Sequence, residues 1–261
     1  MMRLAGKVAI VTGAGEGIGR GIAVAFAREG ADLALCDRDP GALEVTRAAV
    51  AAAGRRTVID AFDVRDAGRI ERFVSQAAGE LGRLDILVNN AAIMPVGPLE
   101  TLSEATLEAI LAVNLKAPVL FSKLVTPHLR RAGGGSIIHM ASVTGHNGFA
   151  GVTVYGATKG AVIALARGQA VELAPDGIRV NTVSPGTVDS PMLHRFLKEH
   201  ARDPVKARAA FDRLHPRGKV ATIEEVAAVF VFLASEEAAN ITATDIRCDG
   251  GFTVQGLQPR E

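Results

Sequence analysis

A tyrosine and a lysine four residues apart are the pair of side chains in this sequence best suited to move a proton. Tyr155 is the only tyrosine among 261 residues. Lys159 follows it within an expected helix, so the two side chains share one face, a turn apart. A phenol with a pKa near 10 is too weak an acid to ionise at neutral pH, and a neighbouring ammonium group lowers that pKa. The pair can therefore act as a general base or acid, although a half-buried tyrosine beside a surface lysine gives the same spacing without catalysis.

Two further polar side chains precede this pair. Ser142 comes 13 residues before Tyr155, directly after an expected strand, where its hydroxyl can donate to a carbonyl oxygen or accept from an alcohol. Asn114 lies inside a long expected helix, where an amide holds the helix less well than apolar or charged residues do. Taken singly, Ser142 is also consistent with a turn or cap, and Asn114 with an exposed helical position.

A glycine-rich turn follows the first expected strand and precedes a helix. It reads Thr12-Gly13-Ala14-Gly15-Glu16-Gly17-Ile18-Gly19. Glycines here let the backbone turn tightly and approach a pyrophosphate, whose negative charge is favoured at a helix N-terminus. The turn predicts a dinucleotide site, with a ligand-free glycine-rich connection as the alternative.

An acidic residue at the end of the second expected strand bears on which dinucleotide binds. Asp37, 24 residues after Gly13, is placed to accept hydrogen bonds from the adenosine ribose hydroxyls, and its carboxylate repels the additional phosphate of NADP. Arg38 is the contrary signal, because a guanidinium can pair with that phosphate. Glu16 adds a second carboxylate, so the balance favours NAD as the cofactor. No metal site is expected.

Short apolar runs alternate with amphipathic segments along the chain. Strands are expected at Val8 to Thr12, Asp32 to Cys36, Thr57 to Phe62, Leu84 to Asn89, Ser136 to Met140, Arg179 to Ser184 and Ile246 to Cys248. Helices are expected at Gly17 to Glu29, Gly41 to Ala53, Ala67 to Leu81, Ser103 to Arg131, Val154 to Leu173 and Ile223 to Ala234. Several strands are apolar on both faces, which is typical of a parallel sheet covered by helices on both sides. The predicted fold is α/β, a doubly wound Rossmann fold with a seven-stranded, mostly parallel sheet that binds ligands beyond its carboxyl edge.

Residues 1–261 are expected to form a single domain. No Pro/Ser-rich linker divides the chain, and one long irregular segment, 187–221, is expected to hold short helices around Met192 to Lys198 and Val205 to Leu214 and to act as a substrate-binding lid. The net charge of +1 argues against nucleic acid, and no uninterrupted apolar stretch approaches the roughly 18 residues of a membrane span. Cys36 and Cys248 are expected to be reduced, buried thiols of a cytoplasmic protein.

Together these motifs resemble those of the short-chain dehydrogenase/reductase family, from about Lys7 to Thr253. The glycine turn has the family's Thr-Gly-x-x-x-Gly-x-Gly form, and Asp249-Gly250-Gly251 matches near the end. The resemblance implies a catalytic tetrad, in which the asparagine holds a water near the lysine; its members here are Asn114, Ser142, Tyr155 and Lys159.

The resemblance also implies cofactor contacts at several strand ends. Asp63-Val64 matches the adenine-contacting pair, and Asn89-Asn90-Ala91-Ala92 resembles an Asn-Asn-Ala-Gly motif with Ala92 in place of the final glycine. Pro185-Gly186-Thr187-Val188 matches the segment that contacts the nicotinamide carboxamide, and Ser190 stands where threonine is often found. The implied cofactor contacts are Gly13, Gly15, Glu16, Gly17, Ile18, Gly19, Asp37, Arg38, Asp63, Val64, Asn90, Ala91, Tyr155, Lys159, Pro185, Gly186, Val188 and Ser190.

These assignments predict hydride transfer between NAD(H) and a secondary alcohol or ketone, with Tyr155 as the general base or acid. A neutral alcohol, polyol or cyclic ketone is favoured, because no arginine pair suited to a carboxylate is evident. The residues expected to contact the substrate are Ser142, Met94, His146, Asn147, Val152, Tyr155 and Met192. The alternatives are an NADP-dependent 3-ketoacyl reductase of fatty-acid or polyketide synthesis and a non-enzymatic NAD-binding sensor or scaffold. The helix Val154 to Leu173, apolar on more than one face, predicts a subunit interface, and the resemblance implies a homotetramer.

Overall fold

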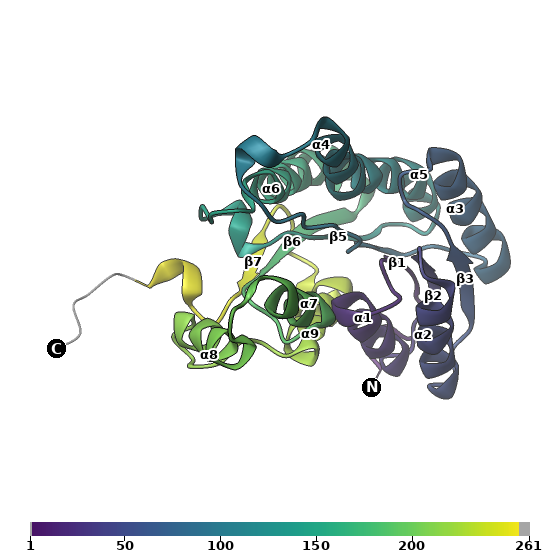
Figure 1. Cartoon of the computed structure of the whole chain (residues 1–261). Coiled ribbons are helices and arrows are strands. Elements are labelled where there is room, and N and C mark those ends of the chain that lie inside the picture. Colours follow the sequence, from purple (N-terminus) through teal and green to yellow (C-terminus); the bar gives the residue numbers. More distant parts are fainter. Residues whose placement is uncertain (1, 256–261) are drawn as a thin grey trace.

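The structure, a computed structural model, describes residues 2–255. Its strands form one parallel seven-stranded sheet in the order β3-β2-β1-β4-β5-β6-β7 (Figure 1). Successive strands are added on one side of β1 up to β3 and on its other side from β4 onward, so the strand order reverses between β1 and β4. The strands are β1 (Val8–Thr12), β2 (Asp32–Asp37), β3 (Thr57–Ala61), β4 (Ile86–Asn89), β5 (Gly135–Met140), β6 (Ile178–Pro185) and β7 (Asp245–Cys248). The predicted α/β, doubly wound fold is confirmed, and each strand end lies within two residues of its predicted position.

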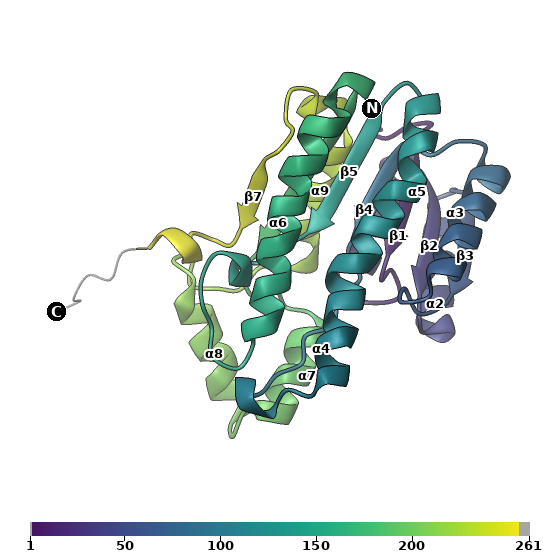
Figure 2. The same cartoon turned by 90° about the horizontal axis from the view of Figure 1, so that it is seen from above.

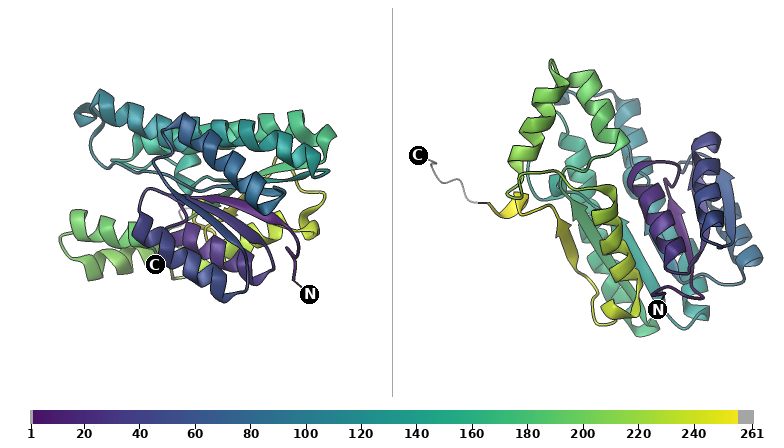
Figure 3. Two further views of the ribbon diagram at one scale, coloured as in Figure 1. Left: turned by 90° about the vertical axis from the view of Figure 1, so that its right-hand side faces the viewer. Right: turned by 90° about the horizontal axis from the view of Figure 1, so that it is seen from below.

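Helices cover both faces of the sheet, so the molecule has three layers (Figure 3). One face carries α1 (Gly17–Arg28), α2 (Pro40–Ala52) and α9 (Ile223–Ala234). The other carries α3 (Ala67–Leu81), α4 (Glu104–Leu111), α5 (Ala117–Arg131) and α6 (Thr153–Leu173), as Figure 2 shows. Shorter helical turns join these elements: η1 (Leu99–Thr101), η2 (Ala112–Lys116), η3 (Val143–Gly145), η4 (Ala174–Asp176), η5 (Glu236–Ala238) and η6 (Phe252–Val254).

Alternation along each strand divides the core between the two helical layers. In β1, Ala9 and Val11 pack into the cluster on the α1 and α9 side. Val8 and Ile10 pack into the cluster on the α3 and α5 side. All four side chains are buried, because a parallel sheet covered on both sides leaves no strand face to water.

The helix predicted over residues 103–131 is interrupted. A π-helical turn, η2, joins α4 to α5, and it contains Asn114, whose side chain is 1 % exposed. Single π-turns inside α-helices are frequent at functional sites. By length and composition alone the run Glu104–Arg131 is apolar enough to cross a membrane, although half of its most apolar window is buried inside the protein, as in a core helix.

The segment 187–221, called the lid segment below, lies beyond the carboxyl ends of the strands (Figure 2). It contains the two short helices that the sequence predicts, α7 (Pro191–His200) and α8 (Pro204–Leu214). A parallel bridge between Val188 and Ala221 joins its two ends. The two ends of the lid segment are therefore held together a few residues after the end of β6.

The two cysteines differ in burial. Both are free thiols, and Cys36 is buried as predicted. Cys248 is only partly buried, which corrects the prediction, because it belongs to β7 at the edge of the sheet and has a neighbouring strand on one side only.

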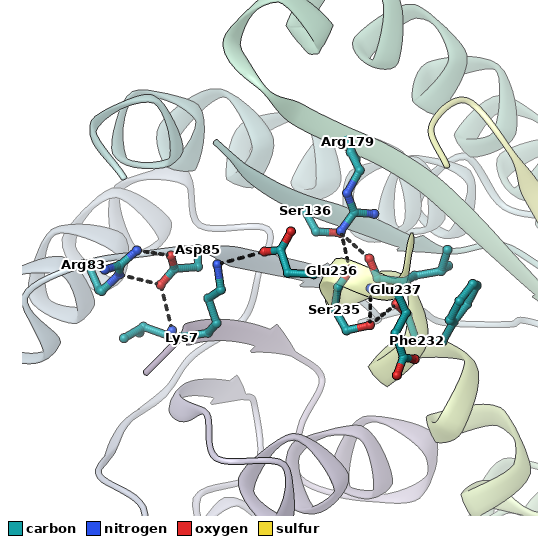
Figure 4. Close-up of polar contacts among 11 residues, drawn as sticks. Lys7, Arg83, Asp85, Ser136, Arg179, Phe232, Ser235, Glu236 and Glu237 are labelled. Carbon is teal, nitrogen blue, oxygen red and sulfur yellow. Dashed lines mark hydrogen bonds and ion pairs between the residues drawn. The ribbon is translucent and has the colours of Figure 1, made fainter. Parts of the chain in front are cut away.

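The amino edge of the sheet carries a set of paired polar groups (Figure 4). Asp85, which is 3 % exposed, accepts a hydrogen bond from Val8 N at 2.9 Å and pairs with Arg83 at 2.5 Å. Lys7 pairs with Glu236 at 3.3 Å across the same edge. These contacts fasten the starts of β1 and β4 together and to the turn after α9.

Candidate functional site

A cavity of about 530 Å³ opens at the carboxyl edge of the sheet, where the strand order reverses. Its walls come from the turns after β1, β2, β3 and β4 and from the start of α7. Crevices at this position are the usual ligand sites of doubly wound sheets. The predicted cofactor residues that line it are Gly13, Glu16, Gly17, Ile18, Gly19, Asp37, Arg38, Asp63, Val64, Asn90, Ala91 and Ser190.

Two positions of the turn have no room for a side chain. A Cβ at Gly15 would lie 2.8 Å from Asp37 Cγ, and one at Gly19 would lie 2.0 Å from Gly13 O. In place of that contact, Gly15 N donates to Asp37 Oδ2 at 2.8 Å. The carboxylate predicted to accept ribose hydroxyls therefore also holds the glycine turn against the end of β2.

Side chains from β4 and α2 brace the same turn. Asn90 Nδ2 donates to Thr12 O and to Gly13 O, each at 3.0 Å. Thr46 Oγ1 donates to Ala14 O at 2.8 Å. The sequence gives no signal for Thr46, because a threonine inside a helix does not indicate a partner 32 residues away.

Glu16 is paired with the lid segment. Its carboxylate lies 2.6 Å from Arg195 Nη2 of α7, and both side chains are about half exposed. The negative charge that Glu16 is expected to add to the cofactor site is therefore offset by Arg195. This arginine is 179 residues away in the sequence, and the pairing of two such distant segments carries no local signal.

The other charges at the cavity leave an excess of carboxylate around the end of β2. Asp63 pairs with Arg65 at 2.6 Å, and that hydrogen bond lowers the pKa of Asp63. Asp37 and Asp39 then stand against Arg38 among the charged residues of the cavity wall. Coulomb repulsion from two carboxylates disfavours an additional phosphate there.

Tyr155 and Lys159 lie near the start of α6 and are 8 % and 2 % exposed. Lys159 Nζ donates to Met140 O at 2.7 Å and lies 5.5 Å from the centroid of the Tyr155 ring. Among the described residues no carboxylate offsets the charge of Lys159. Burial without a counter-charge disfavours the protonated form of a lysine and so lowers its pKa.

Burial dominates the proton affinity of both side chains. It lowers the pKa of Lys159 to about 7. It also raises the pKa of Tyr155 to about 12, and a hydrogen bond with Ser142 acts in the opposite direction. The expected lowering of the Tyr155 pKa is therefore corrected for the chain by itself, because desolvation of the phenolate outweighs the hydrogen bond with Ser142.

The other two predicted tetrad residues reach this pair from separate elements. Ser142 follows β5, and its Oγ accepts from Thr144 N at 3.2 Å. Asn114 Nδ2 donates to Thr158 Oγ1 at 3.2 Å, beside Lys159 in α6. Its amide also exchanges two hydrogen bonds, at 2.9 and 3.0 Å, with the backbone of Ile93. The asparagine thus ties the segment after β4 to α6, and its predicted hold on a water stays a prediction.

A second cavity, of about 220 Å³, adjoins Tyr155. It lies between the segment after β4 and the start of α6, and none of the residues lining it is charged. Of the predicted substrate residues it includes Val152 and Tyr155, whereas Met192 lines the larger cavity. Met94 and Asn147 line neither cavity. The wall also includes residues that no motif in the sequence singles out, namely Val96, Leu99, Thr101, Leu102, Ser103 and Thr106.

His146 is held by a different part of the molecule. Its Nε2 lies 2.8 Å from Asp245 Oδ2 and 3.3 Å from Ser184 Oγ. The prediction that it contacts substrate is therefore corrected, because its ring is engaged at the β6–β7 side and lines neither cavity. Its main partner follows 99 residues later in the chain, beyond the reach of local sequence patterns.

The segment after β6 leads directly into α7. Ser190 Oγ accepts from Leu193 N at 3.4 Å and so caps that helix. The predicted cofactor residues that do not line the larger cavity are Gly15, Tyr155, Lys159, Pro185, Gly186 and Val188. Within residues 2–255, no group of three His, Cys, Asp or Glu side chains is placed to hold a metal ion.

Comparison with known proteins finds relatives over nearly the whole chain. A family model described as enoyl-(acyl carrier protein) reductase matches residues 13–253. Galactitol 2-dehydrogenase from Agrobacterium fabrum is 38% identical over 255 residues, which is 96% of this chain and 98% of that protein. A 3-oxoacyl-acyl-carrier-protein reductase from Thermotoga maritima is 36% identical, over 97% of this chain and 100% of that protein. The crystal structure of carveol dehydrogenase from Mycobacterium avium in complex with NAD has a TM-score of 0.92 at 31% identity, with 98% of this chain and 100% of that chain covered.

Proposed function

The chain belongs to the short-chain dehydrogenase/reductase family, and from that premise we propose that it is an NAD-dependent oxidoreductase that interconverts a neutral secondary alcohol and its ketone. The observation that carries the proposal is the buried Tyr155 and Lys159 pair at the carboxyl edge of the sheet, next to an uncharged cavity. Strongly shifted pKa values of this kind concentrate at catalytic sites.

The glycine turn and its surroundings fit a dinucleotide. The missing Cβ atoms of Gly15 and Gly19 allow the close backbone packing that opens the N-terminus of α1 toward the larger cavity. The excess of carboxylate from Asp37 and Asp39 over Arg38 supports NAD rather than NADP. When bound, NAD supplies the chemistry of a hydride acceptor, and NADH that of a hydride donor.

Tyr155 carries the proton. In alcohol oxidation its phenolate takes the hydroxyl proton of the substrate, and in ketone reduction its phenol returns that proton to the carbonyl oxygen. With a pKa of about 12 in the chain by itself, Tyr155 is well suited to donate at neutral pH and needs added positive charge to accept. The proposal therefore predicts that oxidation speeds up as the pH rises, whereas reduction does not.

Ser142 and Lys159 support this transfer. The Ser142 side chain acts on the Tyr155 hydroxyl and lowers its pKa, so its hydroxyl is placed to hold the reacting oxygen of the substrate at the same point. Lys159, held by Met140 O, supplies positive charge that stabilises the phenolate in the fraction of molecules in which it is protonated. A lysine with a pKa of about 7 can also pass protons at neutral pH.

The smaller cavity supports a neutral substrate. Thr101, Ser103 and Thr106 lie among apolar residues on its wall, and no charged residue lines it. Such a wall suits a polyol or a cyclic ketone better than a carboxylic acid or a phosphate ester. The galactitol dehydrogenase among the relatives is consistent with this substrate class.

We also propose that the protein is a cytoplasmic homotetramer. The outer face of α6 exposes small and apolar residues, among them Ala157, Ala164, Gly168 and Val171, the last 78 % exposed. Small residues allow close packing of a second helix, and an apolar face of this kind is costly to leave in water. Light scattering tests this, and a monomeric mass would contradict it.

The experiment that tests the function is a panel of secondary alcohols, polyols and ketones, followed by NADH absorbance in both directions. We expect turnover with at least one neutral substrate and a preference for NAD(H). Replacing Asp37 with serine should reduce that preference by about tenfold, the effect of about 1.4 kcal/mol of lost repulsion.

The same panel separates the alternatives. A preference for NADPH with 3-ketoacyl thioesters would identify the reductase of acyl-chain synthesis, to which Arg38 and the Thermotoga maritima relative point. Tight dinucleotide binding without turnover on any substrate would identify a sensor or scaffold.

A further inference from the structure

Directly after β6, the amide group of Val188 has no partner among the described residues. Ala221 N donates to Thr187 O at 3.0 Å, and Asp189 N donates to Ala221 O at 2.8 Å. This pattern is a parallel bridge between Val188 and Ala221, in which the N–H and C=O of Val188 point away from Ala221. Across residues 2–255 no acceptor binds the Val188 N–H. An unpaired amide at the carboxyl edge of the sheet is available to a ligand.

An imidazole ring fixes the peptide that precedes this amide. Thr187 N donates to His215 Nε2 at 3.1 Å, and His215 Nδ1 lies 2.8 Å from Phe211 O. A backbone N–H only donates and a carbonyl only accepts, so this ring is neutral and carries its hydrogen on Nδ1. Because His215 caps the end of α8, its hydrogen bond joins the lid segment to the end of β6.

The ring has no room to turn. It is buried, and its centroid lies 5.3 Å from that of the Phe252 ring. Gly186 packs against its edge, since a Cβ there would lie 2.8 Å from His215 Nε2 and 3.1 Å from Asp249 Cα. The ring and the peptide at Thr187 therefore hold one another in a single arrangement.

We infer that His215 is a positioning residue for cofactor binding. By accepting from Thr187 N, it fixes the Gly186–Thr187 peptide, while Ala221 N holds Thr187 O on the following peptide. Together these two contacts keep the Val188 N–H turned away from Ala221, where a dinucleotide can bind it. The nature of the ligand rests on the proposed function. His215 does not touch the ligand, and it acts through Thr187.

Two substitutions separate positioning from packing. His215→Gln can present an amide oxygen to Thr187 N, whereas His215→Leu fills a similar space without an acceptor. We expect the Kd for NADH to rise about 3- to 10-fold in His215→Leu, the effect of one lost hydrogen bond, and to stay within about twofold in His215→Gln. His128→Leu on α5, remote from the site, is the control and should bind NADH as the wild type does.

An NMR measurement makes the test independent of the variants. The 15N shifts of His215 in the wild-type protein should report the Nδ1–H tautomer, and an Nε2–H tautomer would overturn the proposal. Normal NADH affinity in His215→Leu, or equal losses in the Gln and Leu variants, would overturn it as well. Absence of dinucleotide binding by the wild type would instead contradict the proposed function.

Discussion

Asp85 at the amino edge of the sheet and Lys159 at the carboxyl edge are both almost fully buried, yet their surroundings differ. Asp85 is matched by Arg83 and by the Val8 N–H, so its charge is fully compensated (Figure 4). Lys159 has the carbonyl of Met140 and no carboxylate among the described residues. Burial by itself therefore does not distinguish a structural charge from a catalytic one. The distinguishing feature is whether the protein provides a counter-charge.

The largest effect on stability is expected at the compensated edge. Asp85→Ala leaves the Val8 N–H buried without an acceptor and Arg83 without its partner. We expect the free energy of unfolding to fall by about 3 kcal/mol, measured by urea denaturation. Asp85→Asn, which keeps an acceptor oxygen, should lose less than half of that. A loss below 1 kcal/mol in the alanine variant would show that this edge does not hold the fold.

At the carboxyl edge, where Lys159 has no counter-charge among the described residues, removal of the charge is expected to raise the free energy of unfolding. The folded chain holds Lys159 with a pKa of about 7 against an ordinary value of 10.5, so between these pH values unfolding takes up a proton. Above pH 10.5 the lysine is neutral in both the folded and the unfolded chain, so it does not lower the free energy of unfolding. As the pH falls from 10.5 to about 7, only the unfolded chain takes up the proton, and the free energy of unfolding decreases. Lys159→Met removes that cost, about 5 kcal/mol for the full shift, but it also leaves the buried Met140 O without its partner. The net rise in the free energy of unfolding at pH 7 should therefore be on the order of 2 kcal/mol.

Measurements at two pH values make the test of Lys159→Met specific. The gain over wild type should shrink between pH 7 and 9.5, below the range in which Tyr155 ionises. Turnover should fall at least about 100-fold at every pH. A gain in stability that does not change with pH would contradict the shifted lysine pKa.

The smallest effect is expected from backbone strain near the amino edge. Ala243, two residues before β7, has a φ of 59°, a left-handed conformation that a Cβ disfavours. Ala243→Gly should therefore raise the free energy of unfolding by about 0.5–1 kcal/mol. Ala239→Gly is the control, since φ there is −54° and glycine should lower stability instead. Equal effects of the two substitutions would exclude strain as the cause.

The sequence predicts the fold closely because its signals are local. Continuous apolar runs mark buried parallel strands, and the predicted ends of β1 agree with the structure. The sequence predicts one continuous helix across η2, because the apolar periodicity continues through Val113 and Leu115 and only the amide of Asn114 departs from it. A π-turn inserts a single residue into the helix, and one inserted residue changes the apolar periodicity too little to be recognised in the sequence.

In the candidate site, the sequence predicts contacts within one element but not contacts between distant segments. The spacing of Tyr155 and Lys159 is a property of one helix and can be read directly. The pairings of His146 with Asp245 and of Glu16 with Arg195 join distant segments, and only the folded chain brings them together. The direction of the Tyr155 pKa also depends on burial, which the residue types alone do not determine.

The most direct test of the central claim is the turnover of Tyr155→Phe on a substrate that the wild type accepts. The account predicts a loss of at least about 100-fold, the contribution of a general acid–base group. NADH affinity should stay within about twofold, and the melting temperature should not fall, because the phenylalanine ring fills the same buried space. Retention of more than a tenth of wild-type turnover would contradict the assignment of Tyr155 as the proton-transfer group.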